Sequence, residues 1–282
     1  MTLTLPVALA VLAAAALHAG WNALLKGGRS PLLDGALLGL GGAVASLPAL
    51  LLLPLPPPAA WPYLAASLVV HLAYFAGFSA AYRHGDLGQV YPIMRGGAPL
   101  LVAIASAAAV GEVLPAAGWL AVGVITAGLV TVGLRPGGLG AVPPKALAWA
   151  GVTALLIAAY TLIDGLGARA AGNGPAYAVW LMVVQGFVYG AIVAALRGRE
   201  LLARGRERWG RALLGGAMSV LGYAIVLWAA TRAPIAMVAA LRETAVVFAA
   251  LLGAVLLKEG FPGRRLVGAG LVAAGAALLR LA

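Results

Sequence analysis

The amino-acid sequence predicts an all-α, polytopic membrane protein with ten transmembrane helices, arranged as two inverted five-helix repeats. Three observations support this prediction: the composition, the succession of apolar runs, and the similarity between two distant segments. Of the 282 residues, 63% are apolar and only 10% are charged. Soluble domains contain about 45–50% apolar and about 25% charged residues, and a globule this apolar would expose patches that water does not tolerate. The chain is therefore expected to lie in a bilayer.

Ten apolar runs are long enough to cross the hydrocarbon core as helices, which requires about 20 residues each. The first run is expected to be an uncleaved span, because it lacks a basic n-region and is too long for a signal peptide. The connections between the runs are too short to hold a soluble domain. The predicted spans are residues 4–25, 34–54, 63–82, 88–110, 116–134, 146–168, 176–196, 210–231, 234–257 and 265–281.

The basic residues are distributed unequally between the two sides of the predicted membrane. Fourteen of the 19 Lys and Arg residues lie in the connections on one side, three lie on the other, and Arg95 and Arg242 lie inside spans. The positive-inside rule then places the arginine-rich connections in the cytoplasm and both termini outside. The net charge of +11 indicates contacts with the lipid bilayer and no nucleic-acid partner, since no nucleic-acid-binding motif accompanies it.

Several classes of chemistry are disfavoured by the residue inventory. The chain has no cysteine, which excludes disulfides, thiolate metal sites and cysteine nucleophiles. Its three histidines lie on distant spans, so neither a metal site nor a cofactor is expected. An intramembrane enzyme is a weak alternative, because the spans carry no Ser/His pair, paired Asp or HExxH. A channel or lipid flippase remains an open alternative to a carrier.

Two segments of the chain align without a gap when the sequence is shifted by 147 residues. Residues 95–134 then align with residues 242–281, and the identical pairs include Arg95 with Arg242, Glu112 with Glu259, and Pro115 with Pro262. Each predicted unit, residues 1–140 and 141–282, holds five spans, so the second enters the membrane in the opposite direction. Inverted repeats of this kind are typical of secondary transporters that bind substrate near the midplane.

Four short segments carry a family resemblance: GEVLP at 111–115, KEGFP at 258–262, Gly20-Trp21-Asn22 with Lys26, and YPIMRGGAP at 91–99. With these segments the chain resembles the EamA-type transporters of the drug/metabolite transporter superfamily over essentially its whole length. The resemblance implies a gradient-driven, multi-pass carrier of the bacterial inner membrane, often an exporter, as a monomer or homodimer. Such members usually keep both termini in the cytoplasm, opposite to the orientation that the charges indicate.

Polar side chains inside the spans are the candidate site residues, because a charge at the bilayer centre costs about 2.5–3.5 kcal/mol on insertion scales. We expect two polar half-sites, one with His18 and Asn22 beside Arg95, the other with Tyr160 and Asp164 beside Arg242. The candidates for proton coupling are Glu243, Asp164 and His18. The candidates for substrate binding are Arg95, Arg242, Glu243, Tyr91, Trp21, Asn22, His18 and Tyr160.

The two arginine-bearing spans differ in their helix-breaking residues. Pro92 and Pro99 bracket two glycines beside Arg95, which predicts an interrupted backbone hydrogen-bond ladder, whereas the span of Arg242 is predicted to be more regular. The span at 88–110 is therefore the expected ligand helix, with Arg95 more important than Arg242.

Structural interpretations of the same polar residues stay open. Arg95 could form a bridge with Glu243, and Asp164 could pair with Arg169 at the end of its span. His71 could be a packing residue or a site residue, and Glu112 and Glu259 are expected to act as caps.

Guanidinium groups bind carboxylate, phosphate and phosphonate groups through two parallel hydrogen bonds. We therefore expect a secondary active transporter that works by alternating access with proton coupling as an option, and the family resemblance implies that it is an exporter. The expected substrate is a small zwitterionic or anionic metabolite such as an amino acid or an organophosphonate.

Overall fold

The computed structural model describes residues 2–25, 30–133, 138–256 and 263–282, and these residues are almost entirely helical. The helices are α1 Leu5–Leu25, α2 Pro31–Leu50, α3 Trp61–His84, α4 Leu87–Val110, α5 Ala116–Gly133, α6 Pro144–Ala170, α7 Gly174–Ala230, α8 Ile235–Arg242, α9 Ala245–Leu256 and α10 Gly263–Leu278, with short 3-10 turns at Pro58–Ala60 and Gly138–Ala141. Within the described ranges, eight candidate spans are long and apolar enough to cross a membrane. The prediction of an all-α, polytopic membrane protein is confirmed.

The first six helices lie where spans were predicted, and the later ones divide the chain differently. The 57-residue α7 covers two predicted spans and contains a non-helical residue, Arg197, with φ −144° and ψ 39°. The predicted span at 234–257 is split into α8 and α9. The count of ten spans, the inverted repeat and the units 1–140 and 141–282 stay predictions.

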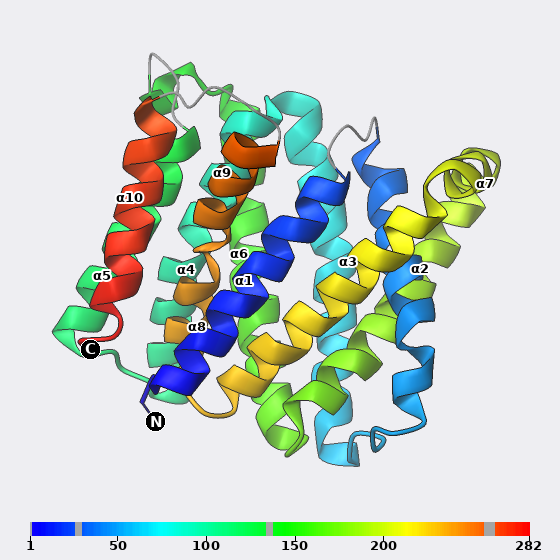
Figure 1. Ribbon diagram of the computed structural model, residues 1–282, viewed down its shortest axis with the longest axis horizontal. Coiled ribbons are helices and arrows are strands. Elements are labelled where there is room, and N and C mark those ends of the chain that lie inside the picture. Colours follow the sequence, from blue (N-terminus) through cyan, green and yellow to red (C-terminus); the bar gives the residue numbers. More distant parts are fainter. Residues whose placement is uncertain (1, 26–29, 134–137, 257–262) are drawn as a thin grey trace.

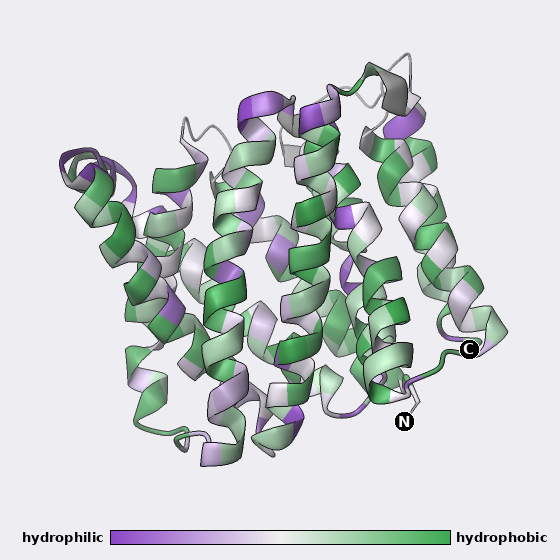
Figure 2. Ribbon diagram, turned by 180° about the vertical axis from the view of Figure 1, so that it is seen from behind, coloured by the Kyte–Doolittle hydropathy of each residue, from purple (hydrophilic) through white to green (hydrophobic). Residues whose placement is uncertain are grey.

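The chain ends and the connections lie on two opposite faces of the bundle. Both termini are at one face, and the ends of α1, α5 and α9 and the starts of α2, α6 and α10 are at the other (Figure 1). The most hydrophilic ribbon segments gather near the second face and at the bend of α7, while the helix flanks are largely hydrophobic (Figure 2). We refer to the second face as the arginine-rich face, because Arg83, Lys145 and Arg264 stand at helix ends there and the bend of α7 carries further arginines.

Small residues bring the helix backbones together. A Cβ atom on Gly41 would collide with the backbone of Ala212, and one on Gly216 would collide with the backbone of Gly42, so α2 packs directly on α7. A Cβ on Gly128 in α5 would lie 2.8 Å from the carbonyl oxygen of Gly268 in α10. Close approach of this kind is the main source of helix association in lipid, where the hydrophobic effect does not drive helices together.

The predicted interruption of the hydrogen-bond ladder in α4 is confined to its two prolines, which lack the amide donor. The helix is continuous from Leu87 to Val110 with Pro92 and Pro99 inside it. A Cβ on Gly96 would lie 3.1 Å from side-chain atoms of α5, and one on Gly133 would lie 2.8 Å from the Pro92 ring. The glycines therefore serve the packing of α4 on α5. Membrane helices tolerate proline because neighbouring helices and local adjustments compensate for the missing hydrogen bond.

The prediction that the span of Arg242 is the more regular of the two is wrong. The helix stops at Arg242 and resumes at Ala245. At the break the amide of Glu243 donates to the carbonyl of Ala240 over 3.1 Å, and the amide of Thr244 donates to Leu241 over 3.1 Å. These are bonds to the third preceding residue, the tighter pattern that marks hinges inside helices. The discontinuity therefore lies at the buried Arg242 and Glu243, and no proline or glycine at this position indicates it in the sequence.

Candidate functional site

A cavity of about 730 Å³ lies between the helices and reaches the arginine-rich face. Pro31, Tyr82 and Arg265 line its mouth, since they stand at helix ends on that face. Its inner end is lined by His71, Tyr160, Tyr223 and Arg242. Seven of the eight predicted substrate-binding residues line this cavity, and Glu243 is the exception. Their role in binding stays a prediction.

Glu243 is bound to Arg95 by two contacts. Arg95 Nη2 lies 2.7 Å from Glu243 Oε1, and Arg95 Nε donates to Glu243 Oε2 over 3.1 Å. Both side chains are buried, and the pair joins α4 to the break between α8 and α9. The structural bridge considered from the sequence is present, and it neutralises the charge of Arg95.

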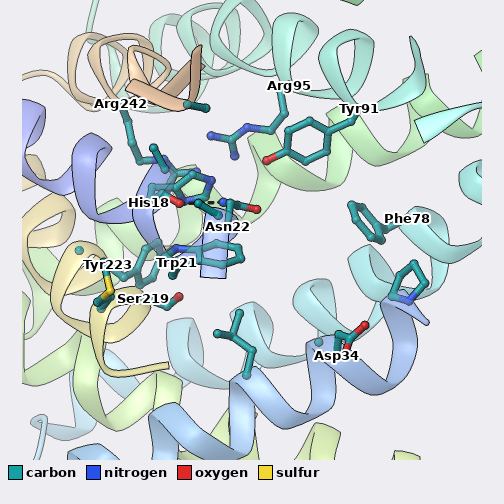
Figure 3. Close-up of a pocket in the computed structure, with 18 of the residues that line it drawn as sticks. His18, Trp21, Asn22, Asp34, Phe78, Tyr91, Arg95, Ser219, Tyr223 and Arg242 are labelled. Atoms are coloured by element: carbon teal, nitrogen blue, oxygen red, sulfur yellow. Dashed lines mark hydrogen bonds between the residues drawn. The ribbon is translucent and has the colours of Figure 1, made fainter. Parts of the chain in front are cut away.

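Arg242 lines the cavity in a different state. Its side chain is 9% exposed, and its Nε has no hydrogen-bond partner. No carboxylate lies within ion-pair distance of it among the described residues. Figure 3 shows the side chain directed toward His18. Arg242 therefore places an uncompensated positive charge at the inner end of the cavity.

The predicted residues of α1 lie at the same end. The His18 ring meets the Trp21 ring edge-on at 4.8 Å between centroids, and its Nε2 is unpartnered. Asn22 Nδ2 donates to the backbone oxygen of His18 over 2.8 Å. Figure 3 shows these residues below Arg95 and beside Arg242. Instead of two separate half-sites, the structure brings both arginines and the α1 residues into one cavity.

An aromatic wall made of Tyr74, Phe78, Tyr82, Tyr91 and Tyr160 covers one side of the cavity. The first three of these residues were not predicted from the sequence. Phe78 contacts Tyr82 at 4.3 Å and faces Tyr91 at 6.5 Å between ring centroids, and Tyr74 packs on Tyr160 at 5.7 Å. A signal was available, because His71, Tyr74, Phe78 and Tyr82 recur at helical spacing and so share one face of α3. The wall is formed by aromatic rings that meet edge to face, and its tyrosines add hydroxyl groups.

Asp164 lies behind the cavity wall and does not line the cavity. It is fully buried and accepts hydrogen bonds from the Tyr177 hydroxyl, over 3.2 Å, and from the Tyr223 hydroxyl. Tyr223 lines the cavity and so stands between Asp164 and its interior. His71 stacks on Tyr160 at 4.2 Å and hydrogen-bonds Ser67 through Nδ1, so it has both packing and polar contacts at the wall.

The proposed pairing of Asp164 with Arg169 is wrong. Arg169 Nη2 lies 2.7 Å from Glu112 Oε1 and donates to the carbonyl of Ala233 over 3.2 Å. Glu112 Oε2 accepts from the amide of Ile235 over 3.0 Å, so the predicted capping role of Glu112 is confirmed at the start of α8. Glu259 and Lys26 lie outside the described residues. The contacts of Glu112 tie α6 to the α8 start at the face of the termini.

Asp34 was also missed in the sequence. It lines the cavity near its mouth and accepts from Arg204 Nε over 3.0 Å, from Arg204 Nη2 over 3.1 Å and from Arg208 over 3.4 Å. The signal was an acidic residue four positions into an apolar run beside a connection rich in arginine. These contacts join the start of α2 to the bend of α7. In the described part of the chain, no group of three His, Cys, Asp or Glu side chains is arranged to hold a metal.

Comparisons with known proteins agree with this architecture. Residues 144–281 match the model of the EamA-like transporter family. Twenty-eight solved chains match, among them a crystal structure of a protein with a TM-score of 0.76, which is 21% identical and aligns over 98% of this chain and 96% of its own. A search of curated proteins found no match. The fold is thus one already seen in crystals, and the second half of the chain, residues 144–281, belongs to the EamA-like transporter family of the drug/metabolite transporter superfamily.

Proposed function

We propose that the protein is a secondary active carrier of a small anionic or zwitterionic metabolite, which it moves by alternating access. The observation that carries this proposal is the unpaired Arg242 at the inner end of the cavity. A buried cation without a partner is unfavourable, so a bound anion would relieve a cost that the empty carrier bears. A carboxylate, phosphate or phosphonate offers two oxygens in the geometry of a guanidinium fork.

The other cavity residues fit the remainder of such a substrate. His18 and Asn22 lie beside Arg242 and offer polar atoms to the anionic end. Tyr91 and Tyr160 belong to the aromatic wall, which suits the apolar body of the substrate and attracts an ammonium group through its ring faces. Arg95 and Glu243 form a buried ion pair that adds no net charge to the site. Trp21 completes the enclosure next to His18.

The position of the cavity's mouth supports export as the direction of transport. Its mouth is at the arginine-rich face, which the positive-inside rule assigns to the cytoplasm. Loading from that side makes the protein an exporter of the inner membrane. The Glu112–Arg169 contacts close the opposite face, so they must separate when the cavity opens there.

A thermal-shift screen tests the substrate class. Purified carrier is heated with amino acids, phosphonates and phosphorylated sugars, because a ligand at 100 times its Kd stabilises the folded state by about 2.7 kcal/mol. We expect anionic or zwitterionic compounds to raise the melting temperature of wild type and of Arg232→Gln, whose arginine is exposed outside the cavity. Arg242→Gln should lose the response. Equal stabilisation of all three proteins would refute the proposed site.

Labelling of single cysteines tests the access route, since the natural chain contains no cysteine. Ser219 lines the cavity, whereas Ser106 is fully buried outside it, so Ser219→Cys and Ser106→Cys form a matched pair. We expect a membrane-impermeant maleimide to label Ser219→Cys from the cytoplasmic side and a stabilising compound to slow that reaction. Ser106→Cys should stay unlabelled. Labelling of Ser219→Cys from the opposite side alone would contradict the proposed direction.

A further inference from the structure

Three titratable side chains were candidates for proton coupling, and their surroundings in the structure differ. Glu243 is held by two contacts from Arg95, so its negative charge is already balanced. His18 faces the cavity beside two arginines, which makes it a poor place for a further positive charge. Asp164 is fully buried and receives hydrogen bonds from the hydroxyls of Tyr177, Tyr223 and Ser67, which carry no charge. Only the last of the three can gain or lose a proton without an ionic partner holding it in one state.

The elements around Asp164 supply no cation that contacts its carboxyl within the described part of the chain. Helix α7 supplies both tyrosine donors, and His71 and Ser67 on α3 face the carboxyl. Arg242 on α8 lies on the cavity side of Tyr223, and Arg169, the nearest arginine along α6, is engaged with Glu112. The titratable or charged groups around the site are Tyr160, His71, Tyr177, Tyr223, Arg169 and Arg242.

The depth of Asp164 relates this carboxyl to the transport cycle. It stands six residues before the end of α6 at the face of the termini, a rise of about 9 Å. The cavity reaches the other face, and Tyr223 separates it from Asp164. Removal from water disfavours an ionised carboxylate that has no cation. Opening the face of the termini would bring water to Asp164 and reverse that preference.

We propose that Asp164 is the proton-binding site of the carrier, with Tyr223 as the link between this carboxyl and the cavity. This inference rests on the proposed function and adds the group through which a proton gradient drives it. A proton from water forms an O–H bond on the carboxylate when the site is hydrated from the face of the termini. The neutral acid then remains when the site closes, and the proton leaves by way of the Tyr223 hydroxyl to water in the cavity when the cavity is open to the arginine-rich face.

Infrared difference spectroscopy of the purified, substrate-free carrier tests the site directly. Between a low and a high pH, wild type should show a carbonyl band of a protonated carboxylic acid that is lost as the pH rises. Asp164→Asn should remove a signal equal to one carboxyl per chain, and Glu243→Gln should retain it. Asp164→Glu, a second variant for the case that the asparagine does not fold, should shift the band, and Tyr223→Phe should shift the pH at which it titrates. Identical difference spectra of wild type and Asp164→Asn would overturn the proposal.

Transport in proteoliposomes separates this proposal from the proposed function. With a compound found by the thermal-shift screen, an imposed pH gradient should drive accumulation by wild type and at least tenfold less by Asp164→Asn. Exchange of labelled for unlabelled compound without a gradient should continue in the variant. Equal gradient-driven accumulation would refute the proton site and leave the carrier function intact. A carboxyl band that depends on Asp164, in a protein that binds none of the compounds, would instead count against the proposed function.

Discussion

Arg95 and Arg242 occupy aligned positions in the two similar segments, yet their side chains are in opposite electrostatic situations. Arg95 lies in the continuous α4 and is held by both oxygens of Glu243. Arg242 ends α8 at a break in the helix, and its Nε has no partner. One arginine is therefore part of the scaffold, and the other is available to a ligand. Two arginines at aligned positions therefore have different roles, because a carboxylate contacts one side chain and none contacts the other among the described residues.

The first test concerns the orientation of the chain in the membrane, which decides the side from which Arg242 is reached. The reporter gives either a full signal or none. Both termini lie on the face opposite the arginine-rich connections (Figure 1). The positive-inside rule then places them outside the cytoplasm. We expect a fluorescent reporter that folds only in the cytoplasm to stay dark when fused after Ala282. A bright reporter would reverse the orientation and turn the proposed exporter into a carrier that is open to the outside.

The buried pair should dominate stability. Removing one partner of a buried ion pair costs about 3–5 kcal/mol because an uncompensated charge remains, so Arg95→Ala and Glu243→Ala should both lower the melting temperature of the empty carrier strongly. The double variant Arg95→Leu with Glu243→Leu should recover most of the loss. Chemical or thermal unfolding in detergent measures this. If Arg95→Ala melts like wild type, the pair is not a structural support.

Arg242 should dominate binding. Loss of one charge-assisted hydrogen bond costs about 1.5–3 kcal/mol, so Arg242→Ala should weaken the affinity for an anionic compound by roughly 10- to 150-fold. The empty variant should melt near wild type, since the removed charge has no partner in the protein. Arg242→Lys should also be impaired, because a point charge lacks the two-donor fork. Calorimetric titration with the best compound of the screen measures the affinities. An unchanged affinity in Arg242→Ala would show that Arg242 does not bind the compound and would remove the contrast with Arg95.

The smallest expected effect is at Glu112, which links the α8 start to Arg169. Both side chains of this pair are partly exposed, so Glu112→Gln should cost only about 0.5–1 kcal/mol of stability. Glu112→Ala should cost more, because the amide of Ile235 also loses its acceptor. Melting temperatures of the two variants check the order. A loss in Glu112→Gln as large as in Arg95→Ala would contradict the contrast between partly exposed and buried pairs.

The sequence alone was sufficient for the fold class and for several of the polar residues that line the cavity. Apolar runs of about 20 residues and the cost of polar groups in lipid are properties of each segment by itself, so they can be summed along the chain. That reasoning selected His18, Asn22, Arg95 and Arg242, all of which line the cavity. It also assigned Glu112 to a cap, which the contact with Ile235 confirms.

The tertiary structure decided which of these polar groups meet. The bond of Glu243 to Arg95, the hydroxyl donors of Asp164 and the pairing of Asp34 with Arg204 all join residues from separate helices. The helix break at Glu243 coincides with such a contact and with no proline or glycine, whereas α4 is continuous through its prolines and packs closely on α5. A side chain carries its charge in the sequence, but its partner depends on crossing geometry between helices far apart along the chain. That geometry is what makes Arg95 a support and leaves Arg242 free.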